Sequence, residues 1–301
     1  MSKFGSRTTA DQVLKDKDLS SKNIVVTGAN TGIGYEAARA LAAAGANVIF
    51  ACRDKAKGLA AVARAKQAHP GCEAQFIQLD LSSFENIRNF CENYPFEKLD
   101  ILIANAGLFS TGYGQTQDNI EATVGVCHLG HFLLTQGLMD KLLKANKPRI
   151  VMVSSESHRS PKELDFDNLP LKKTNYSAFT AYGQAKLCNV LFAKELQRRF
   201  EDKGLSACSL HPGTLITTDI GRNSFWVSLG MKIISPFTKT ANQGASTSVY
   251  CAAYASETEI AGHYFSHCQK ASSSRAAKST ETATRLWQLS EQLCAIYRPD
   301  N

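Results

Sequence analysis

The chain has 301 residues and a formal net charge of +7, from 34 lysines and arginines against 27 aspartates and glutamates. Hydrophobic residues make up 44% and charged residues 20%, which excludes a collagenous, coiled-coil or disordered chain. The charge is mild for this length, so it suits an anionic ligand and predicts no nucleic-acid partner. Nine cysteines without a CxxC pair argue against a zinc site or a disulfide framework and favour a reducing compartment.

The first 18 residues are polar and contain no apolar run that would act as a signal peptide or a membrane anchor. Elsewhere, too, the sequence falls short of the roughly 18 apolar residues that a membrane-spanning helix needs. We therefore expect a cytoplasmic protein, with a nuclear location or peripheral membrane contact left open. Residues 1–18 are predicted to be a polar N-terminal extension, followed by one domain over residues 19–301.

Short apolar runs alternate with longer helix-forming segments along the chain. The runs cover residues 24–26, 48–51, 76–79, 101–103, 150–153 and 207–210. Their continuous apolar character is typical of parallel strands that are covered on both faces. The alternation predicts an α/β fold, in the form of a single-domain Rossmann-type doubly wound parallel sheet with helices on both faces. Residues 270–301 are predicted to form a C-terminal helical extension.

A glycine-rich turn follows the first predicted strand, with a TGxxxGxG spacing. Glycine permits a tight turn and lets the backbone approach a phosphate without a Cβ in the way. The helix N-terminus that follows offers unpaired amides and a partial positive charge to a pyrophosphate. The turn therefore predicts a dinucleotide site that includes Gly28, Ala29, Asn30, Thr31, Gly32, Ile33 and Gly34.

The second predicted strand ends at Cys52 and Arg53, where an NAD-specific site usually has a carboxylate for the ribose 2′-hydroxyl. A guanidinium at this place can bind a 2′-phosphate through charge-assisted hydrogen bonds. We therefore expect NADP(H) as the preferred cofactor, with NAD(H) as the second choice. The alternative is that Arg53 is a solvated surface charge.

Four motifs occur in a fixed order, which are the glycine-rich turn, Asn105-Ala106-Gly107, a serine before Tyr182-x-x-x-Lys186, and Pro212-Gly213. In this order and spacing they resemble the short-chain dehydrogenase/reductase family across about residues 20–265. Residues 51–54, 128–132 and 153–159 are similar to its retinol-dehydrogenase-like branch. Residues 153–159 and 235–240 also resemble WW domain-containing members of that branch, although the positions of the two tryptophans predict no WW modules.

Tyr182 and Lys186 are four residues apart, which places them on one face of a helix. A neighbouring ammonium and the positive ring of an oxidised nicotinamide favour the phenolate form of a tyrosine. The resemblance implies that Tyr182 is the catalytic acid/base and that Lys186 also binds the nicotinamide ribose. It further implies that Ser155 binds the substrate oxygen, whereas Ser154 is expected to cap a turn. The alternative for the tyrosine–lysine pair is an ordinary contact on a helix surface.

The resemblance also assigns further cofactor contacts, which are Asp80, Leu81, Asn105, Ala106, Gly107, Pro212, Gly213 and Thr217. One departure from the family is Cys127, which stands where an asparagine supports a proton relay, largely through its main-chain carbonyl. Cysteine keeps that carbonyl and loses the amide side chain. For His128 and His131 we expect packing or hydrogen bonding and no metal site, because no third ligand is evident. His158 is expected to be a surface or loop histidine.

Residues 218–240 carry several apolar and aromatic side chains and are predicted to cover the substrate. Such a lining binds lipophilic ligands through buried area, at about 25 cal/mol per Å². The prediction is an NADP(H)-dependent oxidoreductase that interconverts an alcohol and a carbonyl on a lipophilic substrate, such as a steroid or retinoid. Alternatives for the segment are a core helix, a homodimer contact or docking on a membrane surface. The alternative function, motivated by Cys127, is a cofactor-binding signalling or scaffold protein with weak or no catalysis.

Overall fold

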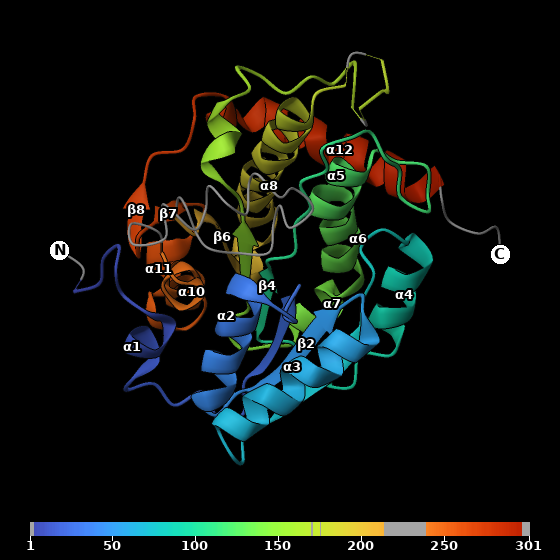
Figure 1. Cartoon of the computed structure of the whole chain (residues 1–301). Coiled ribbons are helices and arrows are strands. Elements are labelled where there is room, and N and C mark those ends of the chain that lie inside the picture. The colour runs from blue at the N-terminus through green and yellow to red at the C-terminus, as the bar shows by residue number, and fades with distance from the viewer. Residues whose placement is uncertain (1–2, 170, 175, 214–238, 297–301) are drawn as a thin grey trace, which may run out of the picture.

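The computed structural model describes residues 3–169, 171–174, 176–213 and 239–296 (Figure 1). An eight-stranded sheet runs through this part in the order β3-β2-β1-β4-β5-β6-β7-β8. Strands β1 to β7 pair in parallel, and β8 is antiparallel to β7. The strands are β1 (Asn23–Thr27), β2 (Asn47–Cys52), β3 (Ala74–Gln78), β4 (Ile101–Ala104), β5 (Arg149–Val153), β6 (Ser206–His211), β7 (Tyr264–Ser266) and β8 (Gln269–Ala271).

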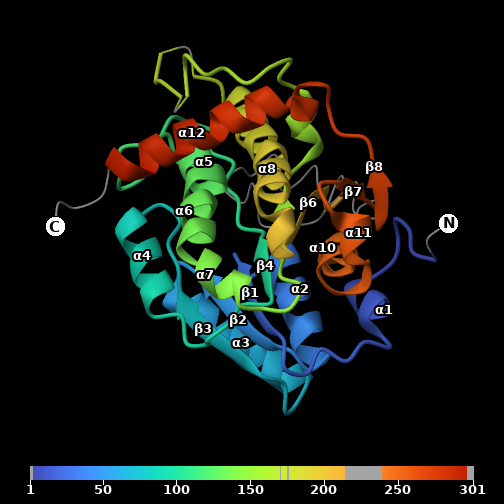
Figure 2. The same cartoon turned by 180° about the vertical axis from the view of Figure 1, so that it is seen from behind.

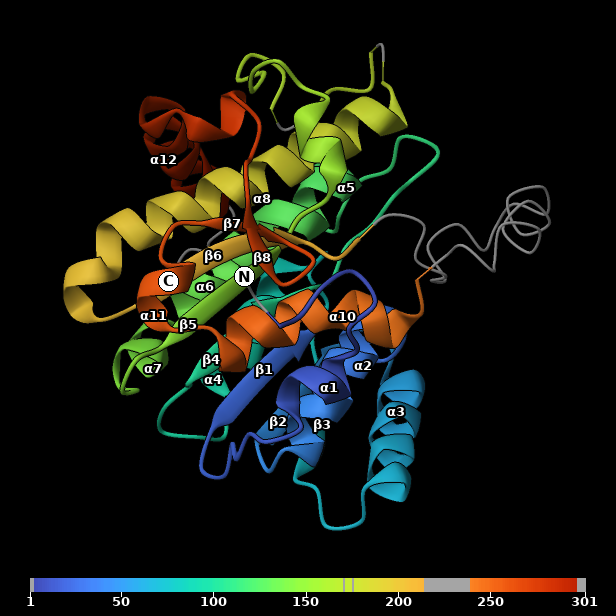
Figure 3. The ribbon, with the colours of Figure 1, turned by 90° about the vertical axis from the view of Figure 1, so that its left-hand side faces the viewer.

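Helices cover both faces of the sheet, as Figure 3 shows from the side. The first core lies under α1 (Ala10–Leu14), α2 (Gly32–Ala43), α3 (Lys55–Ala68), α10 (Ala241–Val249) and α11 (Glu257–Ile260). The second core lies under α4 (Phe84–Glu92), α5 (Ala122–Val124), α6 (Gly130–Gly137), α7 (Met139–Leu143) and α8 (Ala178–Phe200). The last helix, α12 (Thr280–Ile296), packs against α8 on the outside (Figure 2).

The remaining helical elements of the described residues are short stretches of π-helix and 3₁₀-helix. A π-turn, η1 (Gly125–Leu129), joins α5 to α6, and a second, η5 (Tyr250–Tyr254), extends α10. The 3₁₀ turns are η2 (Glu156–Arg159), η3 (Glu201–Lys203) and η6 (Ala276–Lys278). No helix among the residues that the structure describes combines the length and the apolar character that crossing a bilayer requires.

The sheet explains why its strands read as continuous apolar runs. Ile24 and Val26 of β1 point into the first core and Val25 into the second, because successive side chains of a strand alternate between faces. All five residues of β1 are buried. The six predicted strands and the doubly wound Rossmann-type fold are confirmed. Two short strands, β7 and β8, were not predicted, and the predicted helical extension from residue 270 is corrected, because its helix begins at Thr280.

The N-terminal extension is not simply a polar lead-in, because four of its apolar side chains belong to the first core. These buried residues are Phe4, Ala10, Val13 and Leu14. The ring of Phe4 packs edge-on against Tyr254, with ring centroids 4.8 Å apart. A capping box between Thr9 and Gln12 starts α1, and the Ala10 amide donates to the Asn242 side chain of α10 at 2.8 Å. This part of the extension therefore belongs to the domain, which corrects the boundary expected at residue 19.

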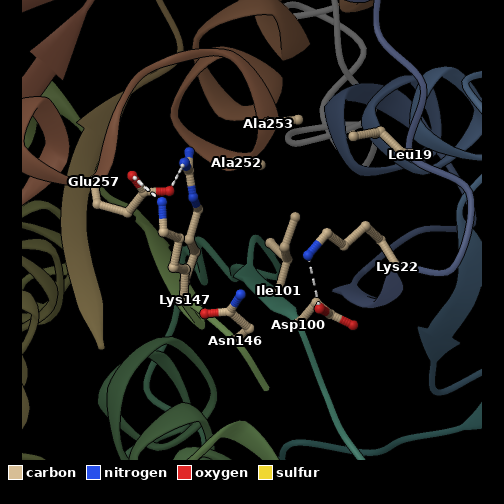
Figure 4. A pocket seen from close by; sticks show the side chains of 10 residues that line it. Leu19, Lys22, Asp100, Ile101, Asn146, Lys147, Ala252, Ala253 and Glu257 are labelled. Atoms are coloured by element: carbon tan, nitrogen blue, oxygen red, sulfur yellow. Dashed lines mark hydrogen bonds and ion pairs between the residues drawn. The ribbon is translucent and has the colours of Figure 1, made fainter. Parts of the chain in front are cut away.

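The amino edge of the sheet holds the ion pairs Lys22–Asp100, Lys147–Glu257 and Arg149–Glu257 around a cavity of about 160 Å³ (Figure 4). Buried Asp100, just before β4, accepts a hydrogen bond from Lys22 Nζ at 3.0 Å. Arg149, at the start of β5, donates to Glu257 at 2.8 Å and to two main-chain carbonyls in and just after η5. The Lys22–Asp100 pair joins the beginnings of β1 and β4, and the Arg149 contacts join the beginning of β5 to the elements that follow α10.

The Arg149–Glu257 pair gives a pH-dependent contribution to stability. The hydrogen bond from Arg149 holds the pKa of Glu257 at about 2, below the ordinary value of 4.5. A carboxyl with a lowered folded-state pKa stabilises the fold above its unfolded pKa, and this contribution is lost as the pH falls from about 4.5 towards 2. Because Glu257 is 32% exposed and therefore screened, we expect Glu257→Gln to lower the free energy of unfolding by about 1 kcal/mol at pH 7.

Urea unfolding at pH 7 and at pH 3 measures this contribution, with Glu291→Gln on the exposed face of α12 as the control. The difference between the chain and Glu257→Gln should narrow at pH 3, whereas the control should match the chain at both values. A difference of the same size at both pH values would mean that the carboxylate charge is not its source.

Candidate active site

The order of the strands places a cavity at the carboxyl edge of the sheet. The chain runs from β1 outwards to β3 and then returns to β4 on the other side of β1. Ligands of such sheets bind beyond the carboxyl ends of the strands at this switch point. A cavity of about 300 Å³ lies there, and its described lining is Gly28, Asn30, Thr31, Gly32, Ile33, Gly34, Asn105, Ala106, Gly107, Val153, Ser154, Tyr182, Lys186 and Pro212.

The glycine-rich turn leaves no room for side chains where a phosphate is predicted to bind. Gly28 and Gly32 have φ angles of 67° and 59°, in the left-handed region that glycine adopts without steric penalty. Helix α2 begins at Gly32, so the amides of its first turn lie at the cavity. A Cβ on Gly34 would collide with the carbonyl oxygen of Gly28 and the side-chain amide of Asn105.

Thr27, the last residue of β1, joins the ends of β1 and β4. Its buried Oγ1 accepts hydrogen bonds from the amides of Asn105 and Ala106, each at 2.9 Å. The Asn105 side chain donates in return to the Thr27 carbonyl at 2.8 Å. This bracing fixes the predicted cofactor loop against the glycine-rich turn. Thr27 was not predicted from the sequence, because a threonine at a strand end is too common to signal a role.

Tyr182 and Lys186 lie one turn apart on α8, as their spacing predicted, with Lys186 Nζ 5.5 Å from the centre of the tyrosine ring. Lys186 is only 3% exposed, and its Nζ donates to the Val153 carbonyl at 3.1 Å. A Cβ on Gly107 would come within 3.3 Å of that Nζ. The ammonium is therefore enclosed between the end of β5 and the loop after β4, beside the cavity.

The two serines after β5 have different positions. Ser154 is buried, donates to the Lys186 main-chain carbonyl at 2.7 Å and lines the cavity. Ser155 accepts a hydrogen bond from the Ser157 amide at 3.2 Å, which caps η2. The turn capping that we expected of Ser154 is thus made by Ser155. The described lining of the cavity includes Ser154 and not Ser155, and the substrate contact of Ser155 stays a prediction.

Two charged residues among the predicted cofactor contacts, Arg53 and Asp80, lie outside the described lining. Arg53 is exposed directly after β2, which leaves its guanidinium accessible to a ligand. The carboxylate of Asp80, after β3, accepts hydrogen bonds from the amide and hydroxyl of Ser82 at 3.0 and 2.6 Å. Asp80 therefore shapes a turn at the strand end, and its approach to a cofactor stays a prediction.

The other predicted contacts also lie outside the described lining or fall outside the described residues. Ala29 and Leu81 are buried. Gly213 has a φ of 123°, and a Cβ there would meet the Lys239 side chain at 2.8 Å. Thr217, and the predicted substrate-covering segment up to residue 238, lie outside the residues that the structure describes.

The two histidines after Cys127 make separate hydrogen bonds. Nε2 of His128 lies 2.9 Å from the Ser290 hydroxyl of α12, and Nε2 of His131 lies 2.8 Å from Thr27 Oγ1. Burial lowers the pKa of His128 to about 3 and that of His131 to about 4, so both rings are neutral at pH 7. The expected hydrogen bonding is confirmed. In the described parts of the chain, no three His, Cys, Asp or Glu side chains gather as a metal site would need.

His158 is buried, which corrects the expectation of a surface or loop histidine. Its Nδ1 lies 2.6 Å from the Ser155 carbonyl oxygen, and its Nε2 accepts the Ser274 amide at 3.1 Å. The segment after β8 covers the ring, and nothing near His158 in the sequence signals that contact. His158 thereby holds the backbone of Ser155 in place.

An aromatic row leads from Tyr182 towards solvent. Phe109, in the loop after β4, makes edge-to-face contacts with Tyr182 and with Phe179, at centroid distances of 5.5 and 5.3 Å. The ring of Phe179 is 77% exposed, which is unusual for a large apolar side chain. Neither phenylalanine was predicted from the sequence, because their positions relative to Tyr182 depend on the fold.

Comparisons with known proteins show the family of this chain. The model of the short chain dehydrogenases matches residues 22–165. The WW domain-containing oxidoreductase of Gallus gallus is 42% identical over 299 residues, which cover 97% of this chain and 72% of that protein. Retinol dehydrogenase 12 of Mus musculus is 42% identical over 280 residues, which cover 92% of this chain and 88% of the relative.

Solved structures share the fold. An uncharacterised protein from Mycobacterium paratuberculosis is 32% identical with a TM-score of 0.76, over 94% of this chain and 97% of that one. A short chain dehydrogenase from Escherichia coli, in complex with NADPH, is 24% identical with a TM-score of 0.66, over 82% of this chain and 96% of that one. The chain belongs to the short-chain dehydrogenase/reductase family, in its retinol-dehydrogenase-like branch. It is an oxidoreductase of the alcohol–carbonyl class, and the scaffold alternative is not favoured.

The crowding at Gly34 predicts that Gly34→Ala impairs both stability and cofactor binding. An added methyl group forces the Gly28 carbonyl and the Asn105 side chain apart, an overpacking that costs about 1–3 kcal/mol. Thermal unfolding and a fluorescence titration with NADPH measure the two effects. Gly112→Ala is the matched control, because a Cβ at Gly112 meets nothing within 4 Å. Equal NADPH affinities of the two variants would contradict the assignment of this turn to the cofactor.

Proposed function

We propose that this chain is an NADP(H)-dependent oxidoreductase that interconverts an alcohol and a carbonyl on a lipophilic substrate, with Tyr182 as the general acid/base. The observation that carries the proposal is the common cavity of the glycine-rich turn, the loop after β4, Tyr182 and Lys186. These residues come from segments far apart in the sequence and meet at the switch point of the sheet. A hydride cofactor and a proton donor need to act on the same substrate carbon–oxygen bond, so this meeting is what the reaction requires.

The backbone around the cavity fits a dinucleotide. The amides at the start of α2 suit a pyrophosphate, and the absence of a Cβ at Gly34 leaves the turn tight. Asn105, Ala106 and Gly107 form the adjoining wall, and Lys186 Nζ lies beside Gly107, within reach of a ribose hydroxyl in that place. When bound, the nicotinamide supplies or accepts the hydride.

Tyr182 and Lys186 have different roles in the proposed proton transfer. The Tyr182 hydroxyl gives a proton to the substrate oxygen in the reductive direction and takes it back in the oxidative one. The Lys186 ammonium, fixed by the Val153 carbonyl, stabilises the phenolate that results. Burial strengthens this effect, because a charge removed from water is screened less. Ser155 is proposed to hold the substrate oxygen.

The preference for NADP(H) is supported by the end of β2. Cys52 offers no carboxylate for a ribose 2′-hydroxyl, and burial raises the pKa of its thiol to about 11. The next carboxylate, Asp54, is occupied as the N-cap of α3, where it accepts the Lys57 amide at 3.0 Å. The exposed guanidinium of Arg53 then remains as the charged group suited to a 2′-phosphate.

A lipophilic substrate is supported by the aromatic row at Tyr182. The exposed Phe179 and its neighbour Phe109 offer apolar surface next to the catalytic hydroxyl, and covering such surface favours binding. Retinol dehydrogenase 12, a 42% identical relative, is named for a lipophilic alcohol. A lipophilic substrate is also compatible with a peripheral contact between this chain and a membrane.

The experiment that tests the proposed function is the replacement Tyr182→Phe. Removing the hydroxyl should lower turnover by about 10²–10⁴-fold, the range that general acid/base groups contribute, while the affinity for NADPH stays unchanged. NADPH oxidation with retinal, steroid ketones and small aldehydes measures turnover, and a fluorescence titration measures affinity. Retained turnover would refute the role of Tyr182. An unmodified chain that neither binds NADPH nor reduces any of these carbonyls would refute the proposed function.

The cofactor preference is tested by Arg53→Ala. Losing charge-assisted hydrogen bonds to the 2′-phosphate should weaken NADPH binding by about 10–100-fold and leave NADH binding unchanged. Lys66→Ala, in the last turn of α3, removes the same charge farther along the helix and serves as the control. Equal losses for NADPH and NADH would show that Arg53 does not read the phosphate.

A further inference from the structure

A buried histidine links three parts of the candidate active site. His131 lies in α6 with no exposed surface. Its Nε2 is 2.8 Å from Thr27 Oγ1 at the end of β1, and its Nδ1 is 3.0 Å from the carbonyl oxygen of Cys127 in the π-turn η1. The ring therefore spans from the strand end that braces the cofactor loop to the turn that faces the catalytic helix.

The hydrogen-bond partners fix the position of the ring proton. Thr27 Oγ1 already accepts two amides, those of Asn105 and Ala106, so its own proton is free to point at His131. Nε2 then accepts a hydrogen bond from the Thr27 hydroxyl. Nδ1 carries the ring hydrogen and donates a hydrogen bond to the Cys127 carbonyl oxygen. This assignment needs a neutral ring, which agrees with the pKa of about 4 that burial produces.

The π-turn lies against the surroundings of Lys186. The Leu108 amide donates to Cys127 Sγ at 3.2 Å, which ties η1 to the loop after β4. A Cβ on Gly107 would lie 3.3 Å from Lys186 Nζ and 3.8 Å from Cys127 Sγ, so the ammonium and the thiol border the same small space. π-turns inside α-helices are frequent at functional sites. A shift of η1 would change the walls around the Lys186 ammonium.

We propose that His131 is a positioning residue with two separate tasks. Its Nε2 edge orients the Thr27 hydroxyl, so that both amides of the cofactor loop stay bound to Thr27 Oγ1. Its Nδ1 edge holds the Cys127 carbonyl, and with it the π-turn beside Lys186. The first task serves cofactor affinity and the second serves turnover. This inference rests on the proposed function, because both tasks act through the NADP(H) site.

Two amide variants separate the tasks. His131→Asn keeps an N–H donor near the place of Nδ1 and loses the acceptor at Nε2. We expect it to weaken NADPH binding by about tenfold, the effect of one lost hydrogen bond, with near-normal kcat at saturating NADPH. His131→Gln offers an amide oxygen near the place of Nε2 and loses the Nδ1 donor. We expect it to lower kcat by about tenfold and to leave NADPH affinity near normal.

His128 provides the matched control. It is also buried and neutral and lies three residues earlier, in η1, but its Nε2 contacts Ser290 of α12 instead of the cavity walls. His128→Asn and His128→Gln should lower the Tm as much as the His131 variants do, with NADPH affinity and kcat unchanged. If the variants at both positions affect only the Tm, or if His131→Asn and His131→Gln lose affinity and turnover alike, the proposal is wrong.

Two further measurements decide the question if the His131 variants fail to fold. Thr27→Val removes the hydroxyl at constant shape and should weaken NADPH binding. Thr27→Ser keeps the hydroxyl and should bind NADPH with unchanged affinity. Nitrogen-15 NMR of the histidine rings should find His131 protonated at Nδ1 and not at Nε2 near neutral pH. The opposite tautomer, or equal affinities of the two Thr27 variants, would overturn the inference. An unmodified chain that binds no NADPH would instead refute the proposed function on which the inference rests.

Discussion

The hydroxyl of Thr27 is the junction on which the carboxyl edge of the sheet depends. At the switch point the chain leaves β1 and β4 in opposite directions, so main-chain groups beyond these strands lose their ladder partners. Thr27 Oγ1 supplies two of the missing acceptor contacts from a fully buried position. The glycine-rich turn begins one residue later, and its approach to a phosphate is only as well defined as the strand end that carries it.

Charged side chains have different partners at the two edges of the sheet. At the amino edge, Lys22 and Arg149 each face a carboxylate. At the carboxyl edge, the described residues give Lys186 a main-chain carbonyl as its partner and no carboxylate. An ammonium that is buried without a counter-charge costs stability. Because no carboxylate of the described residues neutralises the Lys186 ammonium, its charge can stabilise the Tyr182 phenolate in the proposed reaction.

Some features of this fold follow from local sequence. The six predicted strands are apolar throughout because both faces of the sheet are covered. The glycine spacing and the tyrosine–lysine spacing are local patterns that survive any packing of the rest. Phe4 packs against Tyr254 and α1 against α10, more than 200 positions away, so their burial could not be predicted. The same is true of His158, which is covered by the segment after β8.

Within the site, the sequence predicts which residue types occur better than it predicts where each side chain points. A pair of serines after a strand does not tell which of the two lines a cavity, and here Ser154 lines it while Ser155 caps a turn. Likewise Thr27 and His131 are ordinary residues in a strand and a helix until the fold brings them within 2.8 Å. Strands β7 and β8 have three residues each, too few to produce a period in the sequence.

Amide hydrogen exchange with and without NADPH tests directly whether the carboxyl edge of the sheet binds the cofactor, because it reports on the whole backbone at once. We predict slower exchange on adding NADPH in peptides that contain residues 28–34 and 105–107. Peptides around Arg149 and Glu257, at the amino edge, should not change. Unchanged exchange at the carboxyl edge, or protection confined to the amino edge, would show that the cofactor does not bind at the switch point.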